Sequence, residues 1–301
     1  SVIVRVSLDM AGVILTAADT DSDGRADQVG PFARGFVAPL GLAFHEGALY
    51  VSSRGRVATL RDVDGDGQFD DLEEIITGLP NGRHQNNGLA FGPDGKLYIN
   101  VGSTCNACIE TDERNATIMR FNPDGTGGEV YARGLRNVYD IAFHPEDDTL
   151  FGADNGRDDK GLDVPEELNL IVEGGDYGWP DCWGEGRGTN CEGTIAPVAE
   201  LEPRSSADGI AFYTGDQFPP EYHNNIFIAM WGSHSGLQGR KVVRVELSRE
   251  GESYTARVSD FALGLDRPLD LVVAPDGALL IADYGTGVIY RVYAEDDARD
   301  E

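Results

Sequence analysis

The chain has 301 residues, of which 41% are hydrophobic and 9% aromatic, so it is long enough for one large core and too apolar for disorder. Fifty-two acidic residues against 24 basic ones give a net charge of −28, which excludes nucleic acid and anionic lipid as partners. No apolar run reaches the ~18 residues of a membrane-spanning helix. The 39 glycines and 14 prolines suit many tight turns between short strands.

A short strand phrase recurs five times and predicts a propeller, because repeats of this size build radially arranged sheets. The phrase reads Gly-Leu-Ala-Phe or a close variant and begins at Gly41, Gly88, Asp140, Gly209 and Asp270. Turns such as Pro-Asp-Gly at 93–95 and 275–277 then lead into a second strand. We predict an all-β fold in one domain over residues 1–301. It is a six-bladed β-propeller of four-stranded antiparallel blades, closed by strands from both termini, with five blades as the alternative.

Two Asp-rich segments resemble the EF-hand loop, in which alternate residues direct oxygen atoms at one calcium ion. The second segment matches best, and its predicted calcium ligands are Asp62, Asp64, Asp66, Gln68, Asp70 and Glu73. Gly67 permits the sharp bend in that loop. In the first segment the predicted ligands are Asp19, Asp21, Asp23, Arg25 and Asp27, with Gly30 where the last acid would stand. Neither loop is flanked by helical patterns, so we expect calcium to hold neighbouring strands together.

Four cysteines occur as two local pairs, which predicts the disulfides Cys105–Cys108 and Cys182–Cys191. The spacing of the first pair also fits a redox pair or half of a zinc site, but no helical pattern and no second Cys-x-x-Cys accompany it. Disulfides imply an oxidising compartment, so we expect a periplasmic or secreted protein. Ser1 opens directly into an apolar strand, and we interpret the sequence as a mature form whose leader has been removed.

Polar residues gather where the predicted strands start or end, and in a propeller these points lie near the mouth of the central channel. They are His84, Arg136, Asn137, Asn155, Gly156, Arg157, Lys241 and Arg267. One histidine among several cations suggests an anionic cofactor beside a general base. Taken singly, each of these residues could be an ordinary surface or core residue, and for His84 alone that interpretation is favoured. Neither a dinucleotide-binding glycine motif nor a phosphate-binding loop is present.

Several phrases together resemble the soluble quinoprotein glucose and sorbosone dehydrogenases. The most specific are His-Gln-Asn-Asn-Gly-Leu-Ala-Phe at 84–91 and Gly-Gly-Asp-Tyr-Gly-Trp-Pro at 174–180. Gly-Leu-Arg-Asn at 134–137 and Arg-Pro-Leu-Asp at 267–270 continue a resemblance that runs from about Gly12 to Val292. The Asp-rich loops and the Cys-x-x-Cys favour the sorbosone-dehydrogenase-like branch.

The resemblance implies a six-bladed propeller that binds pyrroloquinoline quinone (PQQ) and calcium and oxidises an aldose or sugar aldehyde. By resemblance, His84 is the general base and Arg136 polarises the quinone. Asn137, Asn155, Lys241 and Arg267 would hold the cofactor, and the carbonyl groups of Gly156 and Arg157 would bind its calcium. The resemblance also implies an electron acceptor, a cytochrome or a dye. We expect a monomer or weak dimer.

Four positions depart from the family's pattern and bear on the substrate. Ser103 stands where glucose-oxidising members have Asp, and Arg83 replaces an acid before the histidine. Arg204 replaces a common histidine, and Trp231 stands where sorbosone-type members read His. Two alternatives therefore stay open: a calcium-dependent propeller lactonase, and a non-catalytic carbohydrate-binding propeller. A lactonase needs acids and amides around a central calcium, whereas the candidate channel residues here are mainly basic.

Overall fold

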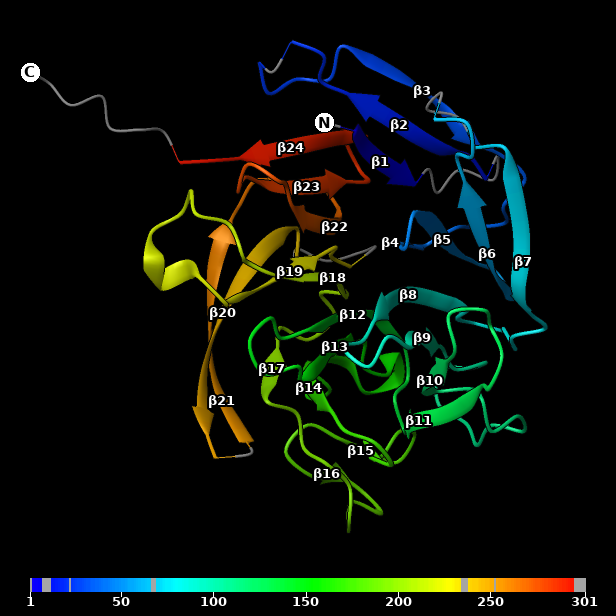
Figure 1. The fold of residues 1–301 in the computed structure, drawn as a ribbon. Helices are drawn as coiled ribbons and strands as arrows, with labels where there is room; N and C mark the ends of the chain where they lie inside the picture. Colours follow the sequence, from blue (N-terminus) through cyan, green and yellow to red (C-terminus); the bar gives the residue numbers. More distant parts are fainter. Residues whose placement is uncertain are drawn as a thin grey trace, which may run out of the picture.

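Each of the five repeat phrases folds into the first strand of an antiparallel sheet (Figure 1). The structure is a computed structural model and describes residues 2–6, 12–21, 23–65, 69–233, 238–251 and 253–294. Consecutive first strands pack against one another, so they form the inner wall of a propeller. These inner strands are β4 (Gly41–His45), β8 (Asn86–Phe91), β12 (Val138–Phe143), β18 (Ala207–Phe212) and β22 (Pro268–Val273).

The other strands of each sheet follow outward in chain order. The second strands are β5 (Ala48–Ser53), β9 (Leu97–Val101), β13 (Leu150–Asp154), β19 (Ile226–Met230) and β23 (Leu279–Asp283). The third strands are β6 (Arg56–Arg61), β10 (Thr117–Phe121), β14 (Glu166–Ile171), β20 (Lys241–Glu250) and β24 (Val288–Val292). Four sheets have a fourth strand among the described residues: β7 (Asp71–Thr77), β11 (Glu129–Arg133), β17 (Ala199–Leu201) and β21 (Ser253–Ala262).

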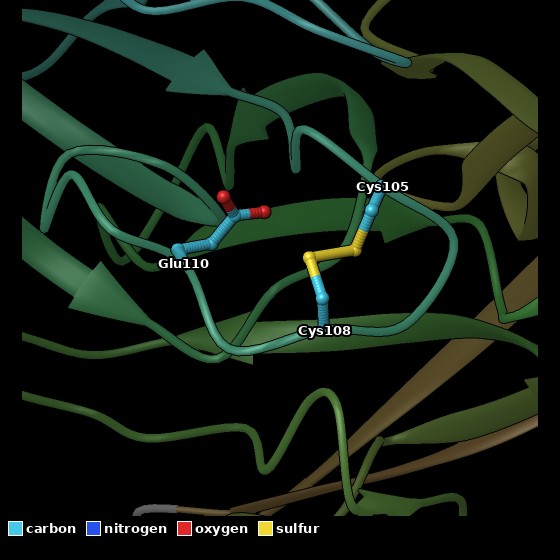
Figure 2. A group of neighbouring side chains, drawn as sticks. All are labelled: Cys105, Cys108 and Glu110. Carbon is cyan, nitrogen blue, oxygen red and sulfur yellow. A yellow bond between two sulfur atoms is a disulfide. The ribbon is translucent and has the colours of Figure 1, made fainter.

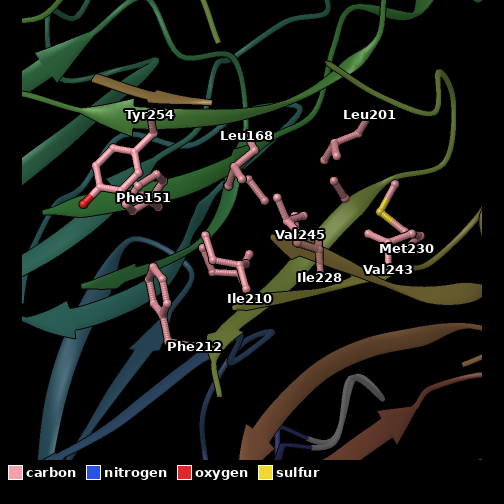
Figure 3. Packing of buried hydrophobic residues seen from close by; sticks show 13 residues of the cluster. Phe151, Leu168, Leu201, Ile210, Phe212, Ile228, Met230, Val243, Val245 and Tyr254 are labelled. Atoms are coloured by element: carbon pink, nitrogen blue, oxygen red, sulfur yellow. The ribbon is translucent and has the colours of Figure 1, made fainter. Parts of the chain in front are cut away.

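The second strands carry the core, because both of their faces are covered by neighbouring sheets. Every residue of β5, β9, β13 and β19 is buried, whereas β7 and β11 are largely exposed. One cluster joins Phe151 and Leu168 of one blade to Phe212 and Ile228 of the next (Figure 3). Blade-on-blade packing of this kind removes apolar surface from water at about 25 cal/mol per Å². The continuous apolar runs of these strands follow from burial on both faces.

The structure forms five blades, so the alternative count is confirmed and the count of six is not. The N-terminal strands β1 (Val2–Val6), β2 (Ile14–Ala18) and β3 (Gln28–Ala33) form a separate three-stranded sheet. Its described residues contain none of the five inner-strand phrases. In Figure 1 this sheet lies between β22–β24 and β4–β7, and its residues pack against the core of β5 and β6. The residues left over at the two termini and the family resemblance both suggested a sixth blade, but a blade requires an inner strand of its own.

The repeated phrase begins with glycine because neighbouring inner strands approach closely at that point. A Cβ atom at Gly41 would lie 2.6 Å from the carbonyl oxygen of Asn87. A Cβ atom at Gly88 would collide with the carboxylate of Asp140, and one at Gly209 with that of Asp270. The two phrases that begin with Asp therefore fill the space beside the phrases that begin with Gly.

Short elements complete the chain. They are the 3-10 turns η1 (Asp158–Asp163) and η2 (Pro220–Tyr222), and the hairpin of β15 (Cys182–Trp183) and β16 (Arg187–Gly188). Among the described residues, no helix is long and apolar enough to cross a membrane.

Candidate functional site

The first Asp-rich loop folds back on itself between β2 and β3. Carboxylate oxygens of Asp19, Asp21 and Asp27 all lie within 4.8 Å of one another. Asp27 Oδ2 accepts hydrogen bonds from the backbone N–H (2.8 Å) and the hydroxyl (2.7 Å) of Thr20, and these bonds lower the pKa of Asp27. Asp23, in contrast, accepts from the backbone N–H of Arg25 and is outside the group.

The second loop, between β6 and β7, repeats this geometry 43 residues later. Carboxylate oxygens of Asp62, Asp64 and Asp70 also lie within 4.8 Å of one another. Asp70 Oδ2 accepts from the backbone N–H of Val63 at 2.7 Å, as Asp27 does from Thr20. The predicted ligands Asp66 and Gln68 lie outside the described residues, as does Gly67. Glu73 lies on the exposed strand β7 and does not join the group.

The candidate cofactor residues gather at one end of the blades. Register pairs Asn86 with Val101, Val138 with Asp154 and Pro268 with Asp283. Inner strands therefore begin where second strands end, and the segments that carry the candidate residues all lie at this end. A cavity of about 250 Å³ opens there, lined by Leu40, Arg54, Gly82, Arg83, His84, Gln85, Asn87, Asn137 and Tyr139.

His84 is half-buried just before β8, and its ring orientation is fixed by Ser103. His84 Nδ1 lies 2.9 Å from Ser103 Oγ, and that hydroxyl donates to the carbonyl oxygen of Cys105 at 2.8 Å. Because the serine proton is used there, Ser103 accepts from His84, so Nδ1 carries the imidazole proton and Nε2 is left basic. Burial, then the charges of Arg136 and Arg83, lower the pKa of His84 to about 3. The imidazole is therefore neutral at pH 7.

Arg136 is buried at the start of β12, and four acceptors hold its guanidinium group. Its Nε donates to the Asn106 carbonyl oxygen (3.0 Å) and its Nη1 to the Asn155 carbonyl oxygen (2.9 Å). Its Nη2 donates to Asn106 Oδ1 (2.9 Å) and to Asp158 Oδ2 (3.1 Å). The backbone N–H groups of Arg136 and Asn137 donate to the carboxylate of Asp154 at 3.0 and 2.6 Å. Arg136 is thus placed rigidly.

Asn155, Gly156 and Arg157 follow β13 and lie against Arg136. Asn155 is 6% exposed, and its Oδ1 finds no hydrogen-bond partner within the described ranges. A Cβ atom at Gly156 would lie 2.4 Å from the carbonyl oxygen of Pro165, so the chain requires glycine there. The backbone N–H of Gly156 donates to Glu166 at 2.6 Å, and burial raises the pKa of Glu166 to about 7. Arg157 pairs with Asp159.

Lys241 and Arg267 lie on later blades, at the starts of β20 and β22. Lys241 Nζ pairs with Asp260 (2.8 Å) and Glu202 (3.3 Å). The Arg267 guanidinium carbon lies 4.7 Å from the centre of the Trp231 ring. No contact within the described part of the chain joins either cation to His84. The structure therefore brings His84, Arg136, Asn137, Asn155, Gly156 and Arg157 into one connected group and leaves Lys241 and Arg267 outside it.

The sequence matches the family described as a domain of unknown function, DUF7133, over residues 6–298. The chain belongs to the DUF7133 family. An uncharacterised protein of Borreliella burgdorferi is 28% identical over 290 residues, covering 85% of this chain and 76% of that protein. The aldose sugar dehydrogenase YliI of Escherichia coli is 25% identical over 241 residues, covering 71% of this chain but only 61% of that enzyme.

Quinoprotein glucose dehydrogenase B of Acinetobacter calcoaceticus is 27% identical over 144 residues, which cover 37% of this chain and 29% of that enzyme. Among solved structures, the holo form of the pyranose dehydrogenase PQQ domain from Coprinopsis cinerea superimposes with a TM-score of 0.81. It is 16% identical, with 97% of this chain and 90% of that chain covered, so it shows a shared fold. The predicted resemblance to soluble sugar dehydrogenases is confirmed. The sorbosone-like branch stays a prediction.

Both predicted disulfides are present in this member of the family, Cys105–Cys108 and Cys182–Cys191. The first closes a tight ring after β9, and Glu110 lies beside it (Figure 2). Glu110 accepts from the backbone N–H (2.7 Å) and the hydroxyl (2.6 Å) of Thr104. Because the two sulfur atoms are bonded to each other, this group is a structural disulfide and not a zinc site.

Asn106 and Asp158 are site residues that sequence reasoning missed. Besides its bonds to Arg136, Asn106 accepts from the backbone N–H of Asp158 (2.8 Å) and donates to Asp159 (3.0 Å). It also accepts from the Trp179 indole at 3.3 Å. The Cys-x-x-Cys ring fixes the backbone of Asn106, so its position between two cysteines was the available signal. Asp158 directly follows the predicted group and gave no signal of its own.

Proposed function

We propose that this chain oxidises an aldose or sugar aldehyde by hydride transfer to PQQ, with His84 as general base. The observation that supports this best is the hydrogen-bond chain from His84 through Ser103 to the carbonyl of Cys105. It leaves a neutral imidazole with an unprotonated Nε2 on a residue that lines a cavity, and a group that accepts a proton must be in this state. The confirmed homology to sugar dehydrogenases supports the same reaction class.

The residues present fit an anionic quinone. The mouth carries several cations in a chain of net charge −28, which suits an anion. A buried acceptor, Asn155 Oδ1, lacks a partner in the described structure and would suit a donor group or the calcium ion. Bound PQQ would supply the hydride acceptor, and its carboxylates require cationic partners. Asn137, Asn155, Lys241 and Arg267 would hold it. The carbonyl groups of Gly156 and Arg157 would bind a calcium ion beside it.

The proposed oxidation takes place at one carbon atom of the sugar, C1. The C1–H bond breaks as a hydride leaves for the acceptor that bound PQQ would supply, the C1 hydroxyl loses its proton to His84 Nε2, and a C1=O bond forms. For an aldose in its ring form the product is a lactone. Arg136, whose guanidinium is held by four acceptors, supplies a fixed positive charge next to the reacting groups and needs little reorganisation.

The two Asp-rich loops are proposed as structural calcium sites. In each, three carboxylates converge although each carries a negative charge, and a divalent cation relieves that repulsion. The second loop connects the third and fourth strands of its blade, and the first loop connects the last two strands of the N-terminal sheet. In both places the metal would hold the edge of a sheet together. The disulfides support a periplasmic or secreted location. A cytochrome-like acceptor would reoxidise the cofactor.

The direct test is a titration of purified protein with PQQ and calcium, followed by quinone absorbance and dye reduction with aldoses. We expect saturable quinone binding and sugar-dependent dye reduction. A protein that binds no quinone would overturn the proposal and favour the lactonase or carbohydrate-binding alternatives. Hydrolysis of an aldonolactone in the same preparation would identify the lactonase.

A further inference from the structure

Three arginines converge on a single carboxylate beside His84. Asp158 Oδ2 accepts from Arg83 Nη2 at 2.6 Å and from Arg136 Nη2 at 3.1 Å. Asp158 Oδ1 accepts from Arg204 Nη1 at 3.0 Å. Three guanidinium groups therefore share this one carboxylate, and the charges of Asp154 and Glu166 also act on Arg136. Arg83 also lines the cavity that contains His84.

Two other cations near this end of the blades have acidic partners of their own. Arg157 has Asp159 as its own partner, and Lys241 has both Glu202 and Asp260. A chain of net charge −28 has many acids with which to neutralise a basic cluster. A cluster of guanidinium groups in such a chain attracts anions to the cavity.

Arg83 and Arg204 retain donors that a ligand can use. Their side chains are 49% and 35% exposed, whereas that of Arg136 is 5% exposed. Within the described ranges, the guanidinium groups of Arg83 and Arg204 bond only to Asp158. An arginine offers five N–H donors, so each group keeps donors that its bonds to Asp158 do not use.

The backbone conformation at Arg204 is a further feature of this cluster. Its φ is +65°, in the left-handed region that residues other than glycine rarely adopt. Such strain is concentrated at functional sites, where the surrounding contacts hold it in place. Eight other described residues besides glycine share a positive φ, but this turn brings the Arg204 guanidinium to Asp158, where it meets Arg83.

We propose that this site selects an anionic sugar, an aldose bearing a carboxylate, and that Arg83 and Arg204 bind that carboxylate. The inference rests on the proposed function for the reaction itself and adds the substrate class. Bidentate pairing of guanidinium with carboxylate gives both strength and orientation. The positive field of Arg136 and Arg83, which lowers the pKa of His84, is the field that such an anion would neutralise.

The test compares D-glucuronate with its uncharged analogue D-glucuronamide by calorimetry, on calcium-loaded protein with and without PQQ. We expect glucuronate to bind more tightly than the amide. Arg83→Gln and Arg204→Gln should each weaken glucuronate binding by roughly tenfold to a hundredfold and leave the amide unchanged. Arg204→Lys should restore part of the loss. Arg257→Gln, which removes an arginine whose side chain is 75% exposed and pairs with Glu246, is the matched control.

Equal binding of glucuronate and the amide by the parent protein would overturn the inference. So would variants that lower PQQ affinity and leave sugar binding intact, since the arginines would then serve the cofactor. The proposed function is judged separately by dye reduction. Oxidation of D-glucose without preference for glucuronate would leave that function standing and remove this inference. Arginine-dependent glucuronate binding without any quinone binding would support this inference and contradict the proposed function.

Discussion

Arg136 and Arg267 lie at the same end of two blades, Arg136 two residues before its inner strand and Arg267 directly before its own, and their side chains have different surroundings. In both blades the last residue of the second strand, Asp154 or Asp283, accepts the backbone N–H groups of the two residues before the inner strand. The two blades therefore share this arrangement of backbone hydrogen bonds. Arg136 is 4% exposed and is held by four acceptors, whereas Arg267 lies over the ring of Trp231.

From this difference we infer that the two sides of the propeller mouth have different roles. The side that carries Arg136 is organised by Asn106 and Asp158 into a rigid group next to His84. The side that carries Arg267 presents a cation with remaining donors. A fixed charge suits stabilisation of the reacting centre, and an accessible one suits binding of a cofactor carboxylate. Turnover and cofactor affinity should therefore respond separately to changes on the two sides.

Among the residues that surround Arg136 and Arg267, the largest separation is expected from Asn106→Ala on the rigid side. It removes one of the two acceptors that Asn106 offers Arg136, together with the side-chain contacts to Asp158 and Asp159. Turnover should fall by about 10²-fold, because small misplacements of catalytic groups cost that much, while PQQ affinity changes little. Asn106→Asp, which keeps the Oδ1 acceptor, should recover part of the turnover.

The matched control is Asn190→Ala, because Asn190 is also adjacent to a disulfide cysteine and its side chain bonds to exposed Asp181. It should behave like the parent protein. If Asn106→Ala and Asn190→Ala had equal turnover, Asn106 would have no positioning role.

A smaller effect, in affinity and not in turnover, is expected from Arg267→Ala on the open side. Loss of a charge-assisted bond to a carboxylate should weaken PQQ binding by about tenfold or more. Turnover at saturating PQQ should stay near that of the parent. Fluorescence or absorbance titration measures the affinity. An unchanged dissociation constant would place Arg267 outside the cofactor site.

The pH dependence sharpens the account of the rigid side. Arg83 and Arg136 lower the pKa of His84, so removing one charge by Arg83→Gln should raise it. It should stay below the ordinary 6.5, because burial, the largest cause of the shift, remains. In the parent, His84 should therefore remain neutral as the pH falls from 8 to 5. NMR titration of the His84 ring checks both statements, and a parent value near 6.5 would contradict them.

The smallest effect is expected far from both sides, in the Asp-rich loops. Calcium that binds only the folded state stabilises it, so a chelator should lower the melting temperature by a few degrees. Asp64→Ala should remove most of the second loop's share, because Asp64 belongs to its carboxylate group. Asp23→Ala, outside the corresponding group of the first loop, should change less. Identical melting curves with and without chelator would contradict both loop assignments.

The fold was largely predictable, because the inner-strand phrases and the apolar second strands are local patterns. The blade count was not, since it depends on whether the N-terminal strands supply an inner strand of their own. The disulfides followed from spacing. The connected group around Arg136 could be predicted only in part, because Asn106, Asp158 and Arg204 lie in three loops far apart in the sequence, and Asn106 and Arg204 each bond to Asp158. The pairing of Ser103 with His84 likewise depends on two adjacent strand ends.

The central claim is that His84 is the base in a quinone-dependent oxidation, and His84→Ala tests it most directly. Quinone titration and dye-coupled turnover should be measured on the same preparations of variant and parent. We predict that the variant binds PQQ and calcium like the parent, because other residues hold them. Its turnover should fall by roughly 10²–10⁴-fold, the contribution of a positioned general base. A His84→Ala protein that binds PQQ and turns over sugar at the parental rate would contradict the account.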